Sequence, residues 1–459
     1  MARLGLQALR LARVADAASQ SSAPQGFLRC RPLLHGFAAA GGAVAGAAIG
    51  WFAWRADGAV ALAAALPLLW AIQPTRAAAG LLWLAYFLVG ARDVVPAVAR
   101  FFPGEPKAFG FVLWGLHAAL LAAPWMILWP RSDAAARVVA LRTASAIVVL
   151  TVPPLGCLGW LSPLLAAGVL YPGLGWAGVV CAVTLFCILA VMGHAVRKSQ
   201  IRSVRRWMVV MGGLLAIGVV ANISYRPTEP PPEWLTVDTQ LGRFPADRHA
   251  GFRRQQQLIG IAEEAITSGA KVIVLPEEVA GTWRTAVAYW WRPLGELAAR
   301  HGATVLVGAD VPVSPGLVEE AASRFTNSLV LLGATEGVVN ARQPIPVGLW
   351  RPWSNTTAVA DFTGSGIIEL RGLRVAVLIC YEDLLAWPVL LSFARVPRPQ
   401  VLISAANNWF HDGADALWIQ RRSVELWARL FGVPLVRAVN LPSQVDHDGL
   451  LVANPEGSH

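Results

Sequence analysis

The sequence predicts a polytopic α-helical membrane domain followed by an α/β domain. The 459-residue chain is 56% hydrophobic and only 14% charged, which is too apolar for an ordinary soluble protein. Long apolar runs fill residues 36–225, whereas short β-rich runs alternate with helical stretches from residue 234 onward. The proline-rich segment 226–233 between them is typical of a stiff linker.

Net positive charge is concentrated in the apolar half of the chain. Residues 1–225 hold 18 Lys and Arg against 5 Asp and Glu, and residues 226–459 hold 20 against 23. Basic residues that flank membrane spans explain this asymmetry, because they anchor the spans and set their orientation. The second half carries no basic stripe of the kind that follows a phosphate backbone, so we expect no nucleic-acid binding.

Residues 1–35 are expected to be a basic tail with five arginines, and we expect no cleavable signal segment in it. Residues 2–14 are compatible with a basic amphipathic helix on the membrane surface or with a disordered tail.

Residues 36–225 predict about seven membrane helices. A span needs about 20 mostly apolar residues, and backbone amides in lipid must be bonded within the segment. The segment Ser162–Trp176 is instead expected to be a re-entrant or interfacial piece. The apolar runs lie at residues 36–54, 58–74, 77–91, 108–129, 143–161, 173–196 and 207–224.

The basic loops predict the orientation of the spans. The N-terminal tail, the loop 131–142 and the cluster 197–206 all lie on the cytoplasmic side if there are seven spans. Residues after 225 then lie outside the cytoplasm. Arg92, Arg100 and Lys107 fall on the opposite side in this arrangement.

The second half, residues 234–459, predicts an α/β domain of packed sheets. The expected strands are 235–239, 272–275, 304–308, 328–332, 374–379, 401–404 and 433–439, and the expected helices are 248–268, 289–301 and 418–431.

Three of these strands end in reactive or polar side chains. KVIVLPEE ends its strand at Pro276 and Glu277, VAVLICYED ends at Cys380, and VLISAANNWF runs into a polar turn. Sites of α/β proteins form at the carboxyl ends of strands. A cysteine thiolate attacks carbonyl carbons when an adjacent base accepts its proton, so Glu277 and Cys380 are the candidate base and nucleophile.

These segments resemble the nitrilase, or carbon–nitrogen hydrolase, superfamily, which has an α-β-β-α sandwich and a Glu–Lys–Cys triad. The preceding membrane half makes the chain most similar to the apolipoprotein N-acyltransferase branch. Within that branch, IPVGLWRPW and AAGVLYPGLGWAG look most like TraB-type conjugal transfer proteins. The resemblance implies that Glu277 is the base, Cys380 the nucleophile, Tyr381 an oxyanion donor through its backbone N–H, and Glu382 the acidic residue after it.

The sequence departs from the family in the loop NARQPIPVG. Ala341 stands at the position of the family lysine, Arg342 follows it, and Leu349 replaces an acidic residue. Arg342 is expected to be a loop cation facing solvent or headgroups, with a catalytic role as the alternative. After the α/β domain we expect no further membrane helix of the kind usual in the family's acyltransferases, because the last residues are polar.

The resemblance implies acyl transfer or amide hydrolysis through a cysteine thioester, with no metal and no organic cofactor. The implied partners are a membrane lipid or lipoprotein acyl substrate and the conjugation machinery. The implied location is the bacterial inner (cytoplasmic) membrane, with multiple passes and an extracytoplasmic nitrilase-like domain. The alternative is an accessory component of the conjugation apparatus with weakened or no catalysis.

Two further interpretations remain open. His411 and Asp412 with Cys380 are compatible with a cysteine–histidine site. Trp350, Trp353 and Trp409 are expected near the mouth of the site, where they would line a groove for an acyl chain.

Overall fold

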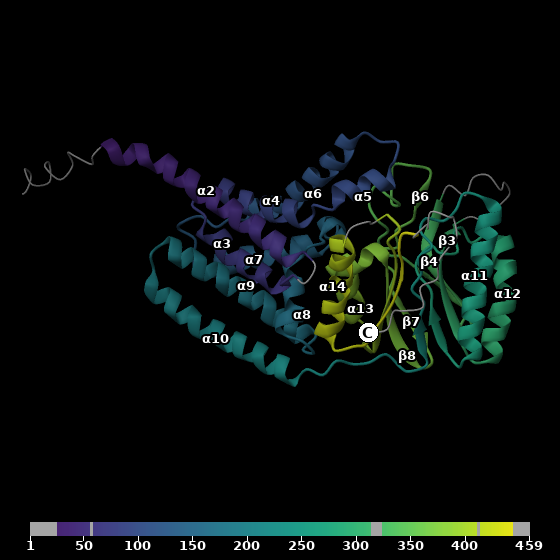
Figure 1. Ribbon diagram of the computed structural model, residues 1–459. Helices are drawn as coiled ribbons and strands as arrows, with labels where there is room; N and C mark the ends of the chain where they lie inside the picture. Colours follow the sequence, from purple (N-terminus) through teal and green to yellow (C-terminus); the bar gives the residue numbers. More distant parts are fainter. Residues whose placement is uncertain (1–24, 56–57, 314–323, 411–413, 444–459) are drawn as a thin grey trace, which may run out of the picture.

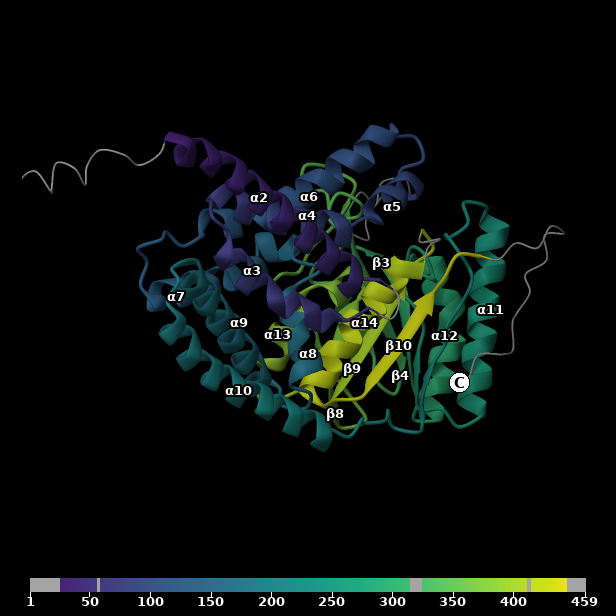
Figure 2. The same cartoon turned by 60° about the vertical axis from the view of Figure 1, so that its left-hand side comes forward.

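The computed structural model describes residues 25–55, 58–313, 324–410 and 414–443. A helical half and an α/β half pack directly against each other (Figures 1 and 2). The first helix begins at Gln25, inside the expected tail, and the possible amphipathic helix at residues 2–14 lies outside the described residues.

The helical half is built from nine α-helices and three short 3-10 helices among the described residues. They are α2 (Gln25–Ala53), η1 (Val60–Ala65), α3 (Leu66–Ile72), α4 (Arg76–Gly90), α5 (Val94–Phe101), α6 (Lys107–Ile127), α7 (Ala136–Thr151), η2 (Leu155–Leu158), η3 (Pro163–Leu165), α8 (Ala166–Leu170), α9 (Trp176–Arg197) and α10 (Ile201–Ser224).

Four helices in the described part of the chain, α2, α6, α9 and α10, are long and apolar enough to cross a membrane. Helices α4 and α5, bent by 50°, add a fifth if they form one span. The runs at 58–74 and 143–161, expected as spans, fold into shorter helices. Pro74 and Pro153 follow these helices, and proline cannot continue the helical hydrogen-bond pattern. The count of about seven spans stays a prediction.

Helices α2 and α4 touch backbone to backbone through glycines spaced four residues apart. A Cβ atom at Gly46 would lie 2.1 Å from the Leu82 carbonyl oxygen, and one at Gly50 would lie 2.5 Å from that of Tyr86. Small residues at this spacing allow helices in membranes to approach closely. These glycines therefore fix the position of α2.

The α/β half contains two sheets. In the first, β1, β2 and β3 are parallel, β4 and β5 continue antiparallel, and β6 adds to β4. In the second, β10, β9 and β8 are parallel and β7 is antiparallel to β8. The strands are β1 (Trp234–Thr236), β2 (Val272–Val274), β3 (Thr304–Pro312), β4 (Arg324–Gly333), β5 (Gly337–Asn340), β6 (Thr357–Ala358), β7 (Ile367–Leu370), β8 (Leu373–Ile379), β9 (Val401–Asn407) and β10 (Leu435–Asn440).

Helices cover the outer faces of both sheets, which gives the expected α-β-β-α order (Figure 1). Helices α11 (Arg248–Thr267) and α12 (Thr285–Arg300) cover the first sheet, and α13 (Ala386–Phe393) and α14 (Ala414–Phe431) cover the second. In strand β8 alternate side chains are buried on opposite faces of the sheet. Val375 and Val377 join the core between the sheets, whereas Ala376 and Leu378 join the core shared with the helical half. Both faces of the strand are buried, so it reads as a continuous apolar run.

The segment 162–176, expected to be re-entrant or interfacial, docks on α14. The backbone amides of Gly173 and Gly175 donate to the carbonyls of Arg429 and Leu430, at 2.9 and 2.7 Å. A Cβ at Gly168 would lie 2.2 Å from the Leu426 carbonyl oxygen. The two halves thus share one core, and the second sheet and its helices face the helical half.

Candidate active site

Glu277 and Cys380 follow the carboxyl ends of two facing strands. Strand β2 ends at Val274 and Glu277 comes three residues later, while Cys380 directly follows β8 and begins the 3-10 helix η4 (Cys380–Leu384). The Cys380 thiol donates to the Asn407 carbonyl oxygen at 3.9 Å, and the backbone N–H of the same Asn407 donates to Glu277 Oε2 at 3.0 Å. The structure therefore places Glu277 and Cys380, the predicted base and nucleophile, in one site.

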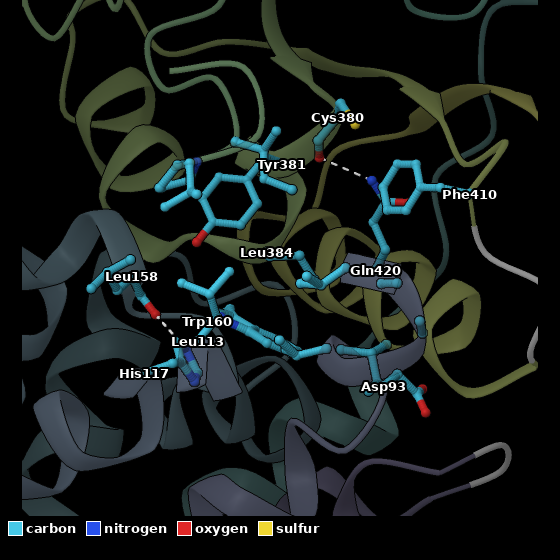
Figure 3. Close-up of a pocket in the computed structure, with 18 of the residues that line it drawn as sticks. Asp93, Leu113, His117, Leu158, Trp160, Cys380, Tyr381, Leu384, Phe410 and Gln420 are labelled. Atoms are coloured by element: carbon cyan, nitrogen blue, oxygen red, sulfur yellow. Dashed lines mark hydrogen bonds between the residues drawn. The ribbon is translucent and has the colours of Figure 1, made fainter. Parts of the chain in front are cut away.

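Cys380 sits in a strained turn between strand and helix. Its φ of 51° lies in the left-handed region, which is uncommon for residues other than glycine and occurs often at functional sites. Gln420 of α14 donates to the Cys380 carbonyl oxygen at 2.9 Å (Figure 3). The Asn408 side chain donates to Gln420 at 2.6 Å. This amide pair holds the nucleophile's backbone in the turn.

The Glu277 carboxyl group is 3% exposed and is held by two asparagines. The Asn327 amide donates to Oε1 at 2.5 Å, and the Asn407 backbone N–H donates to Oε2 at 3.0 Å. Burial, and then the charge of Glu278, raise the pKa of Glu277 to about 8. Burial and the Glu277 charge raise the pKa of the Cys380 thiol well above its usual range. Near neutral pH the pair therefore holds both of its protons most of the time.

Two more buried carboxyl groups, those of Glu278 and Asp310, interact electrostatically with Glu277. Burial raises the pKa of Glu278 to about 7, although Arg243 and Arg254 oppose this. Burial and the charges of both glutamates raise the pKa of Asp310 well above its usual range. Within the described residues no cluster of His, Cys, Asp and Glu is arranged to hold a metal ion.

Arg342 does not face solvent or headgroups, so that expectation is wrong. Its side chain is 0% exposed and its Nε lies 3.1 Å from Glu382 Oε1. The guanidinium also donates to Ser392 Oγ at 2.7 Å and to the carbonyls of Pro388 and Val377 at 2.8 and 2.9 Å. A buried arginine must satisfy its N–H donors. These three partners of the Arg342 guanidinium lie on α13 and β8, so its charge is directed toward these two elements.

Glu382 joins the segment that carries Cys380 to the segment after β5. Its carboxylate accepts from the backbone amides of Ile379, Arg342 and Gln343 at 3.0, 2.7 and 3.2 Å. Glu382 therefore positions the end of β8. The Tyr381 hydroxyl donates to the Cys157 carbonyl at 3.1 Å in the helical half, and the oxyanion role of its backbone N–H stays a prediction.

A pocket of about 210 Å³ lies between the two halves and reaches Cys380. Figure 3 shows Trp160 and His117 at the opposite end from Cys380. The expected tryptophans do not line it: Trp353 is 72% exposed and Trp409 stacks on Phe101, at 5.8 Å between ring centroids. The lining comes from α5, α6, α14 and the segments that follow β8 and β9, with Val94, Leu113, Trp160, Cys380, Phe410 and Gln420 among its residues.

Sequence reasoning missed Asn327 and Gln420, which hold the acid and the nucleophile. Asn327 is a buried polar residue inside the apolar strand β4, and that contrast was the available signal. Gln420 lies on helix α14, and the sequence alone does not show which face of this helix packs against Cys380. His411 and Asp412 of the alternative cysteine–histidine reading lie outside the described residues.

The α-β-β-α sandwich, with a carboxyl group and a thiol after strand ends and an apolar helical half before it, is the architecture that the resemblance to the nitrilase superfamily implied. The chain is 31% identical over 411 residues to the conjugal transfer protein TraB of Agrobacterium fabrum, a match covering 86% of this chain and 90% of that protein. The chain therefore belongs to the TraB family of conjugal transfer proteins.

More distant similarities extend to two other proteins. The chain is 24% identical over 261 residues to an apolipoprotein N-acyltransferase of Methylococcus capsulatus, covering 52% of this chain and 47% of that one. An amidase of the nitrilase superfamily from Nesterenkonia aligns with a TM-score of 0.34 and 14% identity, over 45% of this chain and 74% of that structure. No family model matches the sequence.

Proposed function

We propose that the protein is a membrane-bound acyltransferase or amidase that works through a thioester on Cys380 and serves plasmid conjugal transfer. The observation that carries the proposal is that the Cys380 thiol and the Glu277 carboxyl group both bond to Asn407, with the thiol at a pocket lined from both halves. Such an arrangement pairs a nucleophile with its base at the edge of an apolar binding space.

In the proposed reaction, ionised Glu277 accepts the Cys380 proton while the sulfur attacks an acyl carbonyl carbon. The tetrahedral intermediate collapses to the thioester as Glu277 returns the proton to the leaving group. Water or an amine then attacks the thioester while Glu277 accepts its proton, the C–S bond breaks to release the acylated product, and Glu277 returns the proton to the Cys380 sulfur. With a pKa of about 8, about one tenth of Glu277 is ionised at pH 7, which supports turnover but slows it.

The backbone N–H of Tyr381 is the proposed oxyanion donor. The family lysine is replaced by Ala341, and loss of one donor to the oxyanion typically costs about 10²–10³ in rate. Arg342 acts in this proposal through Glu382, which holds the end of β8, and neither residue touches the reacting atoms.

The proposed substrate is an acyl group from a membrane lipid or lipoprotein, and the proposed acceptor is an amine. Helices α5 and α6 supply part of the pocket wall, so an acyl chain could enter from the side of the helical half. The proposed location is the bacterial inner membrane, with several passes and with the α/β half outside the cytoplasm, and the basic loops support this orientation.

Covalent labelling of the solubilised full-length protein tests this proposal. A reactive acyl ester should leave an acyl adduct on wild-type protein and none on Cys380→Ala, as read by mass spectrometry. Cys157→Ala is the matched control, because it removes another buried thiol and should leave the adduct in place. Labelling that persists in Cys380→Ala would remove Cys380 from the mechanism.

A second candidate function is a structural or accessory role in the conjugation apparatus with little catalysis. Ala341 and Leu349 favour it, since both charged positions of the family loop are lost. Plasmid transfer frequency separates the two candidates. If Cys380→Ala supports transfer as well as wild type, with equal protein in the membrane, the accessory role stands.

A further inference from the structure

Position 341 faces the same side of the first sheet as Asn327. Strands β4 and β5 are antiparallel with Ser328 opposite Asn340, and the next pair, Asn327 and Ala341, is joined by the Ala341 N–H donating to the Asn327 carbonyl at 2.7 Å. Residues directly opposite in such a pair have their Cβ atoms about 4.5–5.5 Å apart on one face. A long side chain at position 341 would therefore extend beside Asn327 toward Glu277, but the Ala341 methyl group cannot.

The Asn327 amide contacts the Glu277 carboxyl group directly. Its Nδ2 donates to Glu277 Oε1 at 2.5 Å, and its side chain is buried, with the residue 2% exposed. The other donor to Glu277, the Asn407 backbone N–H, is neutral as well. Both groups that hold the carboxyl group are thus uncharged.

Asn327 can serve either protonation state of Glu277. Its Oδ1 is buried and has no hydrogen-bond partner among the described residues. A side-chain amide carries a donor and an acceptor, whereas an ammonium group carries donors alone. The Nδ2 end suits a carboxylate, and after the amide turns over, the Oδ1 end accepts from the O–H of a carboxylic acid.

We infer that Asn327 is the positioning residue for Glu277. In this chain its neutral amide holds the carboxyl group toward which a lysine at position 341 would extend. The inference rests on the proposed function, because it concerns the same acid–thiol pair. The titratable groups around Glu277 are Glu278, Asp310 and Cys380, and Arg243 and Arg254 face Glu278. The raised pKa of Glu277 agrees with a base that exchanges its proton near neutral pH instead of staying ionised beside a fixed cation.

The test follows the pH dependence of Cys380 alkylation in solubilised full-length protein. Iodoacetamide is the probe, and mass spectrometry of the Cys380 peptide separates it from the other thiols. Asn327→Ala removes the donor to the Glu277 carboxylate, so the inflection should move up by about one pH unit or more, making alkylation about tenfold slower at pH 7. The control Asn340→Ala removes a neighbouring asparagine that bonds Ser328 instead and should leave the profile unchanged.

Ala341→Lys provides a second variant that does not depend on the folding of Asn327→Ala. An ammonium group brought beside Glu277 should move the inflection down by about one pH unit. Unchanged profiles in both variants overturn the inference, as does an equal shift in Asn340→Ala.

Alkylation needs no acyl substrate, so the two proposals fail separately. Shifted profiles without acyl labelling of wild-type protein leave Asn327 in place and end the proposed function. If wild-type protein is acylated but the pH profiles of the variants do not shift, the proposed function stands and the role of Asn327 is refuted.

Discussion

Replacing Arg342 with alanine should destabilise the protein strongly, because the change leaves the Glu382 charge buried without its cation. Arg342 is 0% exposed and Glu382 is 1% exposed, and the pair is joined at 3.1 Å. Removing one partner of a buried ion pair typically costs about 3–5 kcal/mol. In a folding unit the size of the α/β half, that corresponds to a fall in Tm of about 6–20 °C.

A matched pair on α14 provides the control. Arg421 and Glu425 are joined at 2.7 Å, but their side chains are 68% and 32% exposed. An exposed pair contributes at most about 1 kcal/mol, so Arg421→Ala should lower the Tm by less than about 4 °C. The assay is thermal unfolding of both variants in the same detergent, followed by the fraction that remains monodisperse after heating.

The reasoning would be refuted if Arg342→Ala melted within a degree or two of Arg421→Ala. If acyl labelling of Cys380 were lost at the same time, Arg342 would act in the chemistry and not through Glu382.

Three further predictions concern helix packing, pH and the turn at the nucleophile. Gly46→Ala should reduce the yield of folded protein because its Cβ meets α4 backbone, whereas Gly41→Ala, with nothing within 4 Å, should be neutral or stabilising, as measured by size-exclusion chromatography. The pKa of Glu277 is raised from 4.5 to about 8, so the folded protein binds a proton that the unfolded chain releases. Its stabilising effect is full below pH 4.5 and is lost as pH rises to 8, and Glu277→Gln should flatten that part of the Tm–pH curve; an unchanged slope would contradict the raised pKa. Gln420→Ala should slow acyl labelling of Cys380 without preventing folding, and an unaltered labelling rate would exclude Gln420 from positioning the turn.

The strands that carry the site could be predicted because their apolar runs are buried on both faces and end abruptly. Strands β2 and β9 begin at the predicted residues, and β8 ends at Ile379 as predicted. The motif LPEE marks the end of β2, and ICYE marks the end of β8. Each strand end could be located from its own segment, but β2 and β8 lie in different sheets, so the proximity of Glu277 and Cys380 depends on how the two sheets pack against each other.

Other elements depend on contacts that a local pattern does not carry. Strand β5 (Gly337–Asn340) has four residues, two of them exposed, and helix α13 contains Pro388, which reads as a break. The burial of Arg342 depends on Glu382, forty positions away along the chain. Without that partner an arginine is expected outside.

The helical half shows the same limit. The apolar runs located its helices, but hydropathy alone did not separate spans from short helices such as α3 and α7. The docking of residues 162–176 onto α14 depends on glycines that meet backbone from the other half, which no pattern within either half reveals.

The most direct test of the whole account is the rate at which a short-chain activated ester acylates Cys380 in wild-type protein and in Glu277→Gln at pH 7. If the carboxyl group accepts the thiol proton, the variant should react at least about 100-fold more slowly, with the wild-type adduct mapped to the Cys380 peptide. Equal rates, or an adduct on a different cysteine, would contradict the claim that these two side chains form a working pair.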